Sequence, residues 1–188
     1  PFYSTTGADS TIVSMTQIGM LSSEYVDGVV KVNGEIVSDI DGSELTVRAI
    51  ALDMNSVYGH ASGVRDPAYM NRPQLIEGNW PTAANQCLVD ASMLSTPEQF
   101  KIGSVLRVEG DGVDINSSLV NTEYTIVGII RSPLFISYER GSSTVGTGKL
   151  GAFCYVPSDN FQLDYYSAMC IKIAGSENYD PFSDEYKA

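Results

Sequence analysis

Residues 123–131, Glu123-Tyr-Thr-Ile-Val-Gly-Ile-Ile-Arg131, have the composition of a β-strand at the centre of a core. β-Branched and aromatic residues dominate the stretch, and such residues favour the packed surface of a sheet. Ser132-Pro133 follows and ends the strand, because proline has no backbone N–H group for the ladder. Gly128 lies inside the strand, which is typical of a place where another backbone approaches closely. The stretch therefore predicts a buried central strand.

Further strands are predicted on both sides of this one, wherever a short apolar run is bounded by turn-forming residues. Loops and helical turns fill the intervals between them. The elements expected after residue 54 are strands at 86–90, 104–109, 151–156 and 167–174, helical turns at 91–95 and from Pro157, and a long loop or short helix over 55–73.

In the first part of the chain, the pair Asp41-Gly42 is a strong signal for a hairpin turn. Residues 29–40 before it have a strand-like pattern, and residues 44–52 after it alternate as a return strand should. Further upstream we expect a strand over 10–18 and a short helix over 19–25, ended by Asp27-Gly28.

The overall composition is that of a folded domain with an excess of acid. The 188 residues include 11 Lys and Arg against 23 Asp and Glu, which gives a net charge of −12. At 43% hydrophobic residues, the chain can bury a core as one domain or as two small subdomains. Short strands with few helices in irregular order predict an α+β fold. Turn-forming residues become frequent after Asp53.

The charge also limits the partners. Nucleic acids and anionic membrane surfaces attract lysine and arginine, so an acidic chain is a poor partner for either. No signal peptide is present, and no apolar run approaches the roughly 18–20 residues that cross a bilayer. Because the chain starts at Pro1 and stops at Ala188, we expect it to be a piece of a longer protein whose flanks carried any such segment.

The sequence offers few residues that could act in catalysis. His60 is the only histidine, it lies in a loop-like stretch, and neither Ser56 nor Ser62 has a base held by a third group. Carboxylates are numerous, yet nothing marks a particular pair for glycoside cleavage. We therefore predict no catalytic residue, and a carboxylate-based hydrolase is the third hypothesis for the function.

Two loops resemble ligand-binding motifs but fail in detail. Residues 141–149 suggest a phosphate loop, yet Ser143 replaces the first glycine and Leu150 replaces the magnesium-binding hydroxyl residue. Residues 111–116 gather oxygen ligands but lack the spacing and the distal glutamate of a calcium loop. Both are interpreted as surface loops, so no cofactor and no metal site is predicted.

The three cysteines are Cys87, Cys154 and Cys170, each inside an apolar run. Cysteine in such a place usually behaves as a small buried hydrophobe. A Cys154–Cys170 disulfide would require adjacent segments, which the sequence does not decide. No spacing resembles a zinc site.

Aromatic residues leave a binding role open. Trp80 could be a sugar-stacking platform or could pack over the edge of a sheet, and Tyr155, Tyr165 and Tyr166 could form an interaction surface or a half-buried core edge. The second hypothesis is therefore a secreted carbohydrate- or protein-binding module.

One series of segments is more specific than any catalytic motif. It consists of residues 72–81 (RPQLIEGNWP), 84–94 (ANQCLVDASML), 100–108 (FKIGSVLRV) and 124–133 (YTIVGIIRSP). The series resembles the extracytoplasmic core domain of ABC-exporter permeases of the FtsX/MacB type. Residues 132–141, 149–151 and 155–157 resemble the Gram-positive versions of this domain.

The resemblance implies a domain of two subdomains, one inserted into the other. Residues 10–54 plus 166–188 would form a membrane-proximal mixed α/β subdomain, and residues 55–165 an inserted strand-rich subdomain. The domain would lie on the extracytoplasmic side of the cell membrane, between the first and second transmembrane helices of the permease.

The resemblance also implies a non-catalytic function. The domain would couple motion of the transmembrane helices to a substrate or partner outside the membrane, in a transporter dimer joined through those helices. A separate cytoplasmic ATPase domain or subunit would hydrolyse the nucleotide. Candidate partner contacts are Trp80, Tyr138, Arg140 and Lys149.

Overall fold

The computed structural model describes residues 17–39, 41–91, 99–136, 140–173, 178, 180 and 183–184. Strands dominate it, with one short helix, α1, and the 3₁₀ turns η2 and η3 between them. In chain order the elements are β1 (Gln17–Ser23), β2 (Tyr25–Val32), β3 (Glu35–Ile36), β4 (Thr46–Leu52), α1 (Met54–Tyr58), β5 (Gln74–Gly78), β6 (Gln86–Asp90), β7 (Val105–Glu109), η2 (Ile115–Ser117), β8 (Glu123–Arg131), β9 (Ala152–Pro157), η3 (Ser158–Asn160) and β10 (Ala168–Ile173).

The central sheet closes on itself as a barrel. Its strands pair in the order β2, β4, β9, β6, β8 and β7, and β7 pairs in turn with β2. The β4–β9 and β6–β8 pairs are parallel, and the others in this ring are antiparallel. β3 extends the ring beside β2, and β5 extends it beside β8. Closure leaves only short strands at the edges, which protects the sheet from pairing with other chains.

The barrel interior is the main hydrophobic core. Alternate residues of every ring strand point into it, as the period of two in a β-strand requires. Its fully buried members include Val30, Val47, Cys87, Leu106, Ile126 and Cys154.

A second hydrophobic cluster covers the outer face of β4, β9, β6 and β8. Leu52, Leu88 and Phe153 face outward there and are fully buried by α1 and the loops around it. Phe135, from the loop after β8, stacks on Phe153 with ring centroids 4.2 Å apart. The four strands are thus buried on both faces, which explains why β9 is buried at every position rather than alternately.

Gly128 lies where the expected close approach occurs. A Cβ atom at this position would lie 2.6 Å from the backbone oxygen of Asn79 and 2.9 Å from Leu88. The register of β6 against β8 shifts at this point, between Cys87 and Leu88. A side chain would therefore separate β8 from the strand end of β5, and the prediction from the sequence is confirmed.

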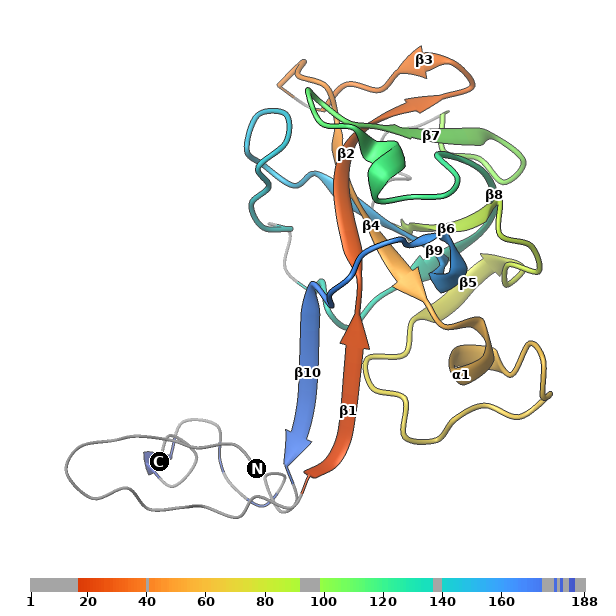
Figure 1. The fold of residues 1–188 in the computed structure, drawn as a ribbon, viewed down its shortest axis with the longest axis vertical. Helices are drawn as coiled ribbons and strands as arrows, with labels where there is room; N and C mark the ends of the chain where they lie inside the picture. Colours follow the sequence, from red (N-terminus) through yellow and green to blue (C-terminus); the bar gives the residue numbers. More distant parts are fainter. Residues whose placement is uncertain are drawn as a thin grey trace.

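The remaining two strands, β1 and β10, form a separate ribbon that projects from the barrel (Figure 1). They pair antiparallel from Gln17 opposite Ile173 to Ser23 opposite Ala168. β1 continues through Glu24 into β2, so the ribbon and the barrel share one nearly continuous run of chain. The chain therefore enters and leaves the described domain at the same far end of the ribbon.

The helix predicted over 19–25 is wrong. Residues 17–23 form β1, and β2 begins at Tyr25. Local composition suggested a helical turn, but pairing with β10, about 150 positions away along the chain, determines the conformation. Non-local pairing of this kind overrides weak local propensity.

The strand predicted over 29–40 is interrupted. Asn33 and Gly34 have φ angles of 51° and 85°, and they turn β2 back into the short strand β3. Asn-Gly is a favoured pair for such a two-residue turn, because both central positions need positive φ. The turn at Asp41-Gly42 is also present, with Gly42 at φ 83°.

The other predicted strands are confirmed. Those at 44–52, 86–90, 104–109, 123–131, 151–156 and 167–174 correspond to β4, β6, β7, β8, β9 and β10, and α1 starts the loop predicted over 55–73. The expected strand over 10–18 and helical turn over 91–95 lie mostly outside the described residues.

The strand-rich mixture is consistent with the predicted α+β class. The ring takes β2 and β4 from the first predicted subdomain and its other strands from the second.

The free energy of unfolding is expected to fall as the pH rises from about 9 to about 12. Burial raises the pKa of Cys154 from 9.0 and of Tyr155 from 10.0, each to about 12, and it also raises the pKa of Cys87 and Tyr124. The unfolded chain loses these protons at lower pH than the folded chain, so the stability present below pH 9 disappears on the way to 12. Urea unfolding at a series of pH values, with tyrosinate absorbance followed in parallel, measures this. An unfolding midpoint independent of pH over the range would contradict it.

Candidate functional site

The junction between ribbon and barrel is held by one serine. Ser167 Oγ accepts a hydrogen bond from the backbone N–H of Tyr25 and donates one to its backbone oxygen, both at 3.2 Å. The backbone N–H of Ser167 donates to the oxygen of Ser23 at 3.0 Å, and that of Ala51 donates to the oxygen of Glu24 at 2.9 Å. These bonds tie the start of β2 to the chain that leads into β10. The ribbon therefore does not meet the barrel through a free linker.

An ion pair supports the same junction from the barrel side. Arg48 on β4 lies opposite Asp27 on β2 and donates to both oxygens of its carboxylate, at 2.7 and 2.8 Å. The Arg48 guanidinium also lies over the Tyr25 ring, 4.0 Å from its centroid, and donates to the backbone oxygen of Ser142. One side chain thus connects the ribbon end of β2, strand β4 and the loop after residue 140.

Charge and burial perturb two groups at this junction. The hydrogen bonds from Arg48 to Asp27 raise the pKa of that guanidinium further, so the guanidinium stays charged. Burial raises the pKa of Glu24, the residue between β1 and β2. The junction therefore contains a hydrogen-bonded ion pair, Arg48 with Asp27, and a carboxyl group, Glu24, that burial makes harder to ionise.

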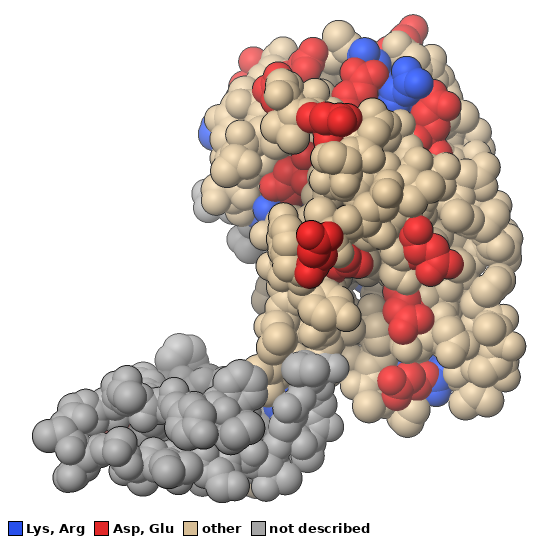
Figure 2. All heavy atoms as spheres, viewed as in Figure 1, with Lys and Arg blue, Asp and Glu red and all other residues tan. Residues whose placement is uncertain are grey.

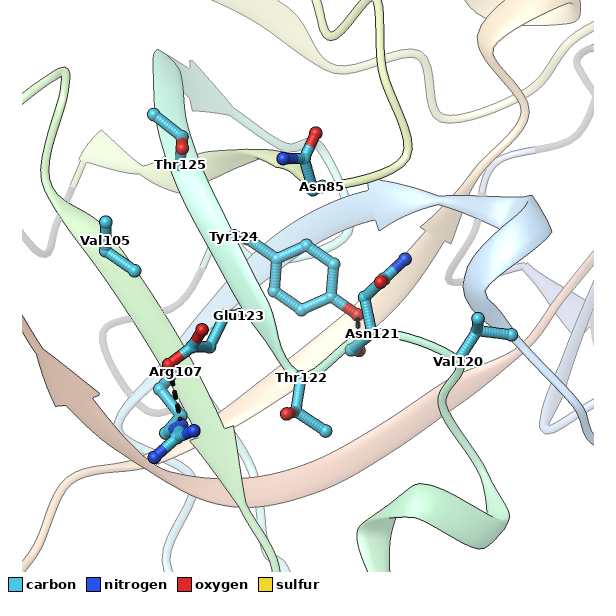
Figure 3. Close-up of a pocket in the computed structure, with 9 residues that line it drawn as sticks. All are labelled: Asn85, Val105, Arg107, Val120, Asn121, Thr122, Glu123, Tyr124 and Thr125. Atoms are coloured by element: carbon cyan, nitrogen blue, oxygen red, sulfur yellow. Dashed lines mark hydrogen bonds and ion pairs between the residues drawn. The ribbon is translucent and has the colours of Figure 1, made fainter.

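A shallow groove crosses the outer surface of β7 and β8 (Figure 3). It is a depression of about 490 Å³ with polar and apolar walls. The side chains that line it are Asn85, Val105, Arg107, Val120, Asn121, Thr122, Glu123, Tyr124 and Thr125. A second depression of about 400 Å³ shares Arg107 and Thr122 with it and extends to the loop after β7.

The floor of this groove is ordered by a buried asparagine. Asn160 is fully buried, and its amide nitrogen donates to the backbone oxygens of Ala84 and Pro157, at 2.8 and 3.0 Å. Its side-chain oxygen accepts from Asn121 Nδ2 at 2.6 Å. Figure 3 shows the ring of Tyr124 pointing to Asn121, whose backbone oxygen accepts from the Tyr124 hydroxyl.

A row of four alternating charges lies beside the groove, across β2, β7 and β8. Lys31 pairs with Glu109 at 2.7 Å, and Arg107 pairs with Glu123 at 3.0 Å and with Glu109 at 3.9 Å. Lys31 and Arg107 face each other across β2 and β7, and Glu109 relieves their repulsion. All four side chains are substantially exposed, so the ion pairs give this surface its charge pattern and add little to the stability of the fold.

The structure does not bring the four predicted partner contacts together. Trp80 is half-buried and stacks on Tyr58, with ring centroids 5.1 Å apart, so one face of its indole is occupied. Lys149 is exposed at the end of the loop that its bridge to Ser142 closes. Tyr138 lies outside the described residues. Whether any of them contacts a partner stays a prediction.

Arg140 has a different environment from that of an exposed contact. Its guanidinium pairs with Asp90 at 3.0 Å, with only 12% and 5% of the two side chains exposed. It also donates to the backbone oxygen of Phe135 at 2.7 Å and lies 5.5 Å from the centroid of the Phe153 ring. This side chain fastens the loop after β8 over the outer hydrophobic cluster.

The motifs interpreted as surface loops are loops. Residues 141–149 form a loop closed by its bridge between Ser142 and Lys149. Asp114 uses its carboxylate to accept from the backbone N–H of Asn116 at the start of η2. Within the described part of the chain, no group of His, Cys, Asp or Glu side chains could hold a metal ion. His60 is exposed and meets Tyr58 edge to face.

All three cysteines are free thiols. Cys87 and Cys154 are fully buried in the barrel, as expected, but Cys170 lies on the ribbon and is only half-buried. The Cys154–Cys170 disulfide, one alternative from the sequence, is not formed: Cys154 on β9 and Cys170 on β10 are both free thiols.

The junction residues Ser167, Tyr25 and Arg48 were not identified from the sequence. Their partners are 142 positions apart for Ser167 and 21 apart for Arg48. Only the facing of opposite charges, Asp27 on β2 and Arg48 on β4, could have given a signal, and it requires the register of β2 against β4 to be known. The asparagine beneath the groove, Asn160, carries no sequence signal of its own.

No family model matches this chain, and no curated protein matches it. Among solved structures, the fold is similar to the extracellular domain of the noncanonic ABC-type transporter YknZ from Gram-positive bacteria. That similarity has a TM-score of 0.44 and 8% sequence identity, over 86% of this chain and 68% of that one.

The fold is also similar to the periplasmic region of MacB from Actinobacillus actinomycetemcomitans. Here the TM-score is 0.44 and the identity 10%, over 87% of this chain and 61% of that one. This chain thus spans about three fifths of the MacB region. Both structures are extracytoplasmic regions, the first of them of an ABC-type transporter. Among the described residues, no helix is long and apolar enough to span a bilayer.

Proposed function

We propose that this chain is the extracytoplasmic domain of an ABC-transporter permease, and that its β1–β10 ribbon carries motion between membrane helices and barrel. The observation that carries the proposal is the pairing of Gln17 with Ile173 at the far end of the ribbon. A domain inserted between two consecutive membrane spans must receive and return the chain at one end. The ribbon meets this requirement and holds the barrel about 20 Å from that end, at about 3.3 Å per residue.

The ribbon is suited to transmit motion because its attachment is stiff. β1 runs into β2 without a loop, and Ser167 and Arg48 fix the direction of that passage. A displacement of the two spans would therefore move the barrel as one body, as in rigid-body domain transitions. The partners in this proposal are a cytoplasmic ATPase domain or subunit, a second permease in the dimer, and an exported substrate or partner outside the membrane.

The predictions on chemistry, location and subdomains belong to the same proposal. The domain acts without bond chemistry, on the extracytoplasmic side of the cell membrane. The membrane-proximal subdomain of residues 10–54 plus 166–188 includes the whole ribbon, and residues 55–165 contribute the groove and most of the outer hydrophobic cluster. A receptor surface for a substrate or partner would then lie on the barrel, away from the spans.

The location of the domain can be tested with a cysteine on the ribbon. Met169 is 52% exposed, so Met169→Cys in a Cys170→Ser background offers one reactive thiol, while Cys87 and Cys154 are buried. In cells that make the full-length parent chain, a membrane-impermeant maleimide should label this thiol without lysis. The parent background without Met169→Cys is the control. Labelling that requires lysis would overturn the proposal.

Ser167→Ala is expected to loosen the ribbon. The change removes two hydrogen bonds from the Tyr25 backbone, at about 0.5–1.5 kcal/mol each. In the full-length permease with Cys170→Ser, spin labels at Met169→Cys and Val113→Cys, both exposed positions, should give one narrow distribution of the distance between them within a chain, with and without trapped nucleotide. Ser167→Ala should broaden it about twofold, and Ser43→Ala, a hydroxyl in the distant hairpin, should not. An equally narrow distribution in Ser167→Ala would show that the serine does not hold the junction.

A further inference from the structure

We infer that β10 is the edge through which two copies of this chain pair, forming one sheet of β1, β10, β10 and β1 across both copies. A two-stranded sheet is marginally stable alone, and within the described part of the chain no further strand pairs with the outer edge of β1 or of β10. β1 contacts β4 where it leaves the ribbon. Figure 1 shows β1 on the side of the ribbon nearer α1 and β10 on the opposite side. The accessible edge is therefore that of β10.

Exposed apolar side chains concentrate at the same place. Tyr165 and Tyr166, just before β10, are 66% and 65% exposed, and Met169 and Ile171 within it are 52% and 39% exposed. Met169 and Ile171 lie on one face of the strand, because side chains two residues apart share a face. Tyrosine and methionine are enriched in the buried centres of protein interfaces. Four exposed apolar side chains within seven positions of the chain therefore favour this segment as a contact surface.

The charge distribution favours a second copy as the occupant. The chain carries −12 overall, and Figure 2 shows acidic side chains over the visible face of the barrel. The ribbon differs, since 17–23 contains no charged residue and 168–173 contains only Lys172. Two copies would repel each other through their barrels but not through their ribbons. A basic partner would instead be drawn to the barrel.

The geometry of pairing is two-fold symmetric. An edge strand that pairs antiparallel with its own copy forms an isologous contact, the form that closed dimers use. The middle of β10 is at Cys170 and Ile171, so these residues would lie at or next to the symmetry axis. Directly opposed residues of antiparallel strands have Cα atoms about 4.5–5.5 Å apart, which suits a disulfide. The inference deepens the proposed function by giving its dimer a contact outside the membrane.

Oxidative cross-linking in membranes that contain the full-length chain tests the pairing. Single cysteines at 169, 170 and 171, with the other cysteines on the ribbon replaced by serine, should include at least one that gives a covalent dimer on non-reducing gels. Cys170→Ser without a replacement should give none, although Cys87 and Cys154 remain. If none of the three positions cross-links, the pairing is wrong. That result leaves the maleimide labelling untouched, so the two proposals fail separately.

A charge at the axis provides a second test. Ile171→Asp would place two carboxylates close to each other in the dimer, so the yield of the best cross-link should fall about tenfold. Ile171→Thr, which keeps a β-branched neutral residue, should retain most of it. An unchanged yield with Ile171→Asp would overturn the assignment of β10 as the paired edge. Maleimide reaction of a cysteine at 169 in the same variant checks that the ribbon remains exposed and folded.

Discussion

Replacing Arg140 with alanine is expected to lower the free energy of unfolding by about 3–5 kcal/mol, because it removes a cation that is paired with a buried carboxylate. Asp90 has 5% of its side chain exposed and pairs with Arg140 at 3.0 Å. The variant also removes the donor to the Phe135 backbone oxygen and the cation over the Phe153 ring. The loop that carries Phe135 would then lose its attachment to the outer hydrophobic cluster.

Urea unfolding of four proteins measures this effect: the parent, Arg140→Ala, Asp90→Ala and the double variant. The double variant should be more stable than Arg140→Ala, because it removes the buried carboxylate together with the cation. Arg107→Ala is the matched control, since Arg107 pairs with Glu123 while 50% exposed, and it should cost less than about 1 kcal/mol. A loss of that small size for Arg140→Ala would contradict the buried role.

This result bears on Arg140 as a candidate partner contact. An arginine in a loop of glycine, serine and tyrosine is a reasonable contact residue on sequence grounds. In the folded chain its guanidinium is committed to Asp90, 50 positions earlier. A binding defect in Arg140→Ala would therefore reflect a displaced loop at least as much as a lost contact. Lys149→Ala tests a surface contact more directly, because Lys149 is exposed.

The strands that the sequence predicted well share one property. β6, β8 and β9 each contain a short, mainly apolar run bounded by proline, glycine or polar residues, so their existence follows from composition. The close approach at Gly128 followed in the same way. Barrel closure did not, because the pairing of Val30 with Val108 joins strands nearly 80 positions apart. Periodicity tells which face of a strand is buried, but it does not tell which strand lies next to it.

The residues of the ribbon junction could not be identified from the sequence for the same reason. In the sequence nothing distinguishes Ser167 from other serines before a strand, and its role becomes evident only when the fold brings Tyr25 beside it. The ribbon itself was divided between a predicted helix over 19–25 and a predicted strand over 167–174. Each half of a two-stranded sheet is a weak signal, since neither strand has a buried face that would impose strict alternation. Resemblance to a family of inserted domains was therefore more informative here than local pattern.

Asn160 is the second residue whose replacement should have a large effect. Asn160→Ala removes two donors from the backbone oxygens of Ala84 and Pro157 and the acceptor for Asn121. Each buried group left without a partner costs about 1–3 kcal/mol, so a total loss of about 3 kcal/mol is expected. Asn121→Ala is the control; it breaks one of these bonds, beside the open groove, and should cost about 1 kcal/mol.

Asn160→Asp tests whether the packing of the Asn160 side chain or its hydrogen bonds stabilise the fold. The aspartate has the same size and still accepts from Asn121, but its ionised form faces two carbonyl oxygens with no donor. The pKa of the introduced carboxyl group in the folded state should therefore lie above its ordinary value of about 3.9. The loss of stability relative to the parent is then small below about pH 3.9 and grows as the pH rises through the folded-state pKa. Urea unfolding of Asn160→Asp and parent at pH values on both sides of the change should show this growth. A difference between the two proteins that does not depend on pH would mean that Asn160 acts by packing alone, and that the groove floor does not rely on its hydrogen bonds.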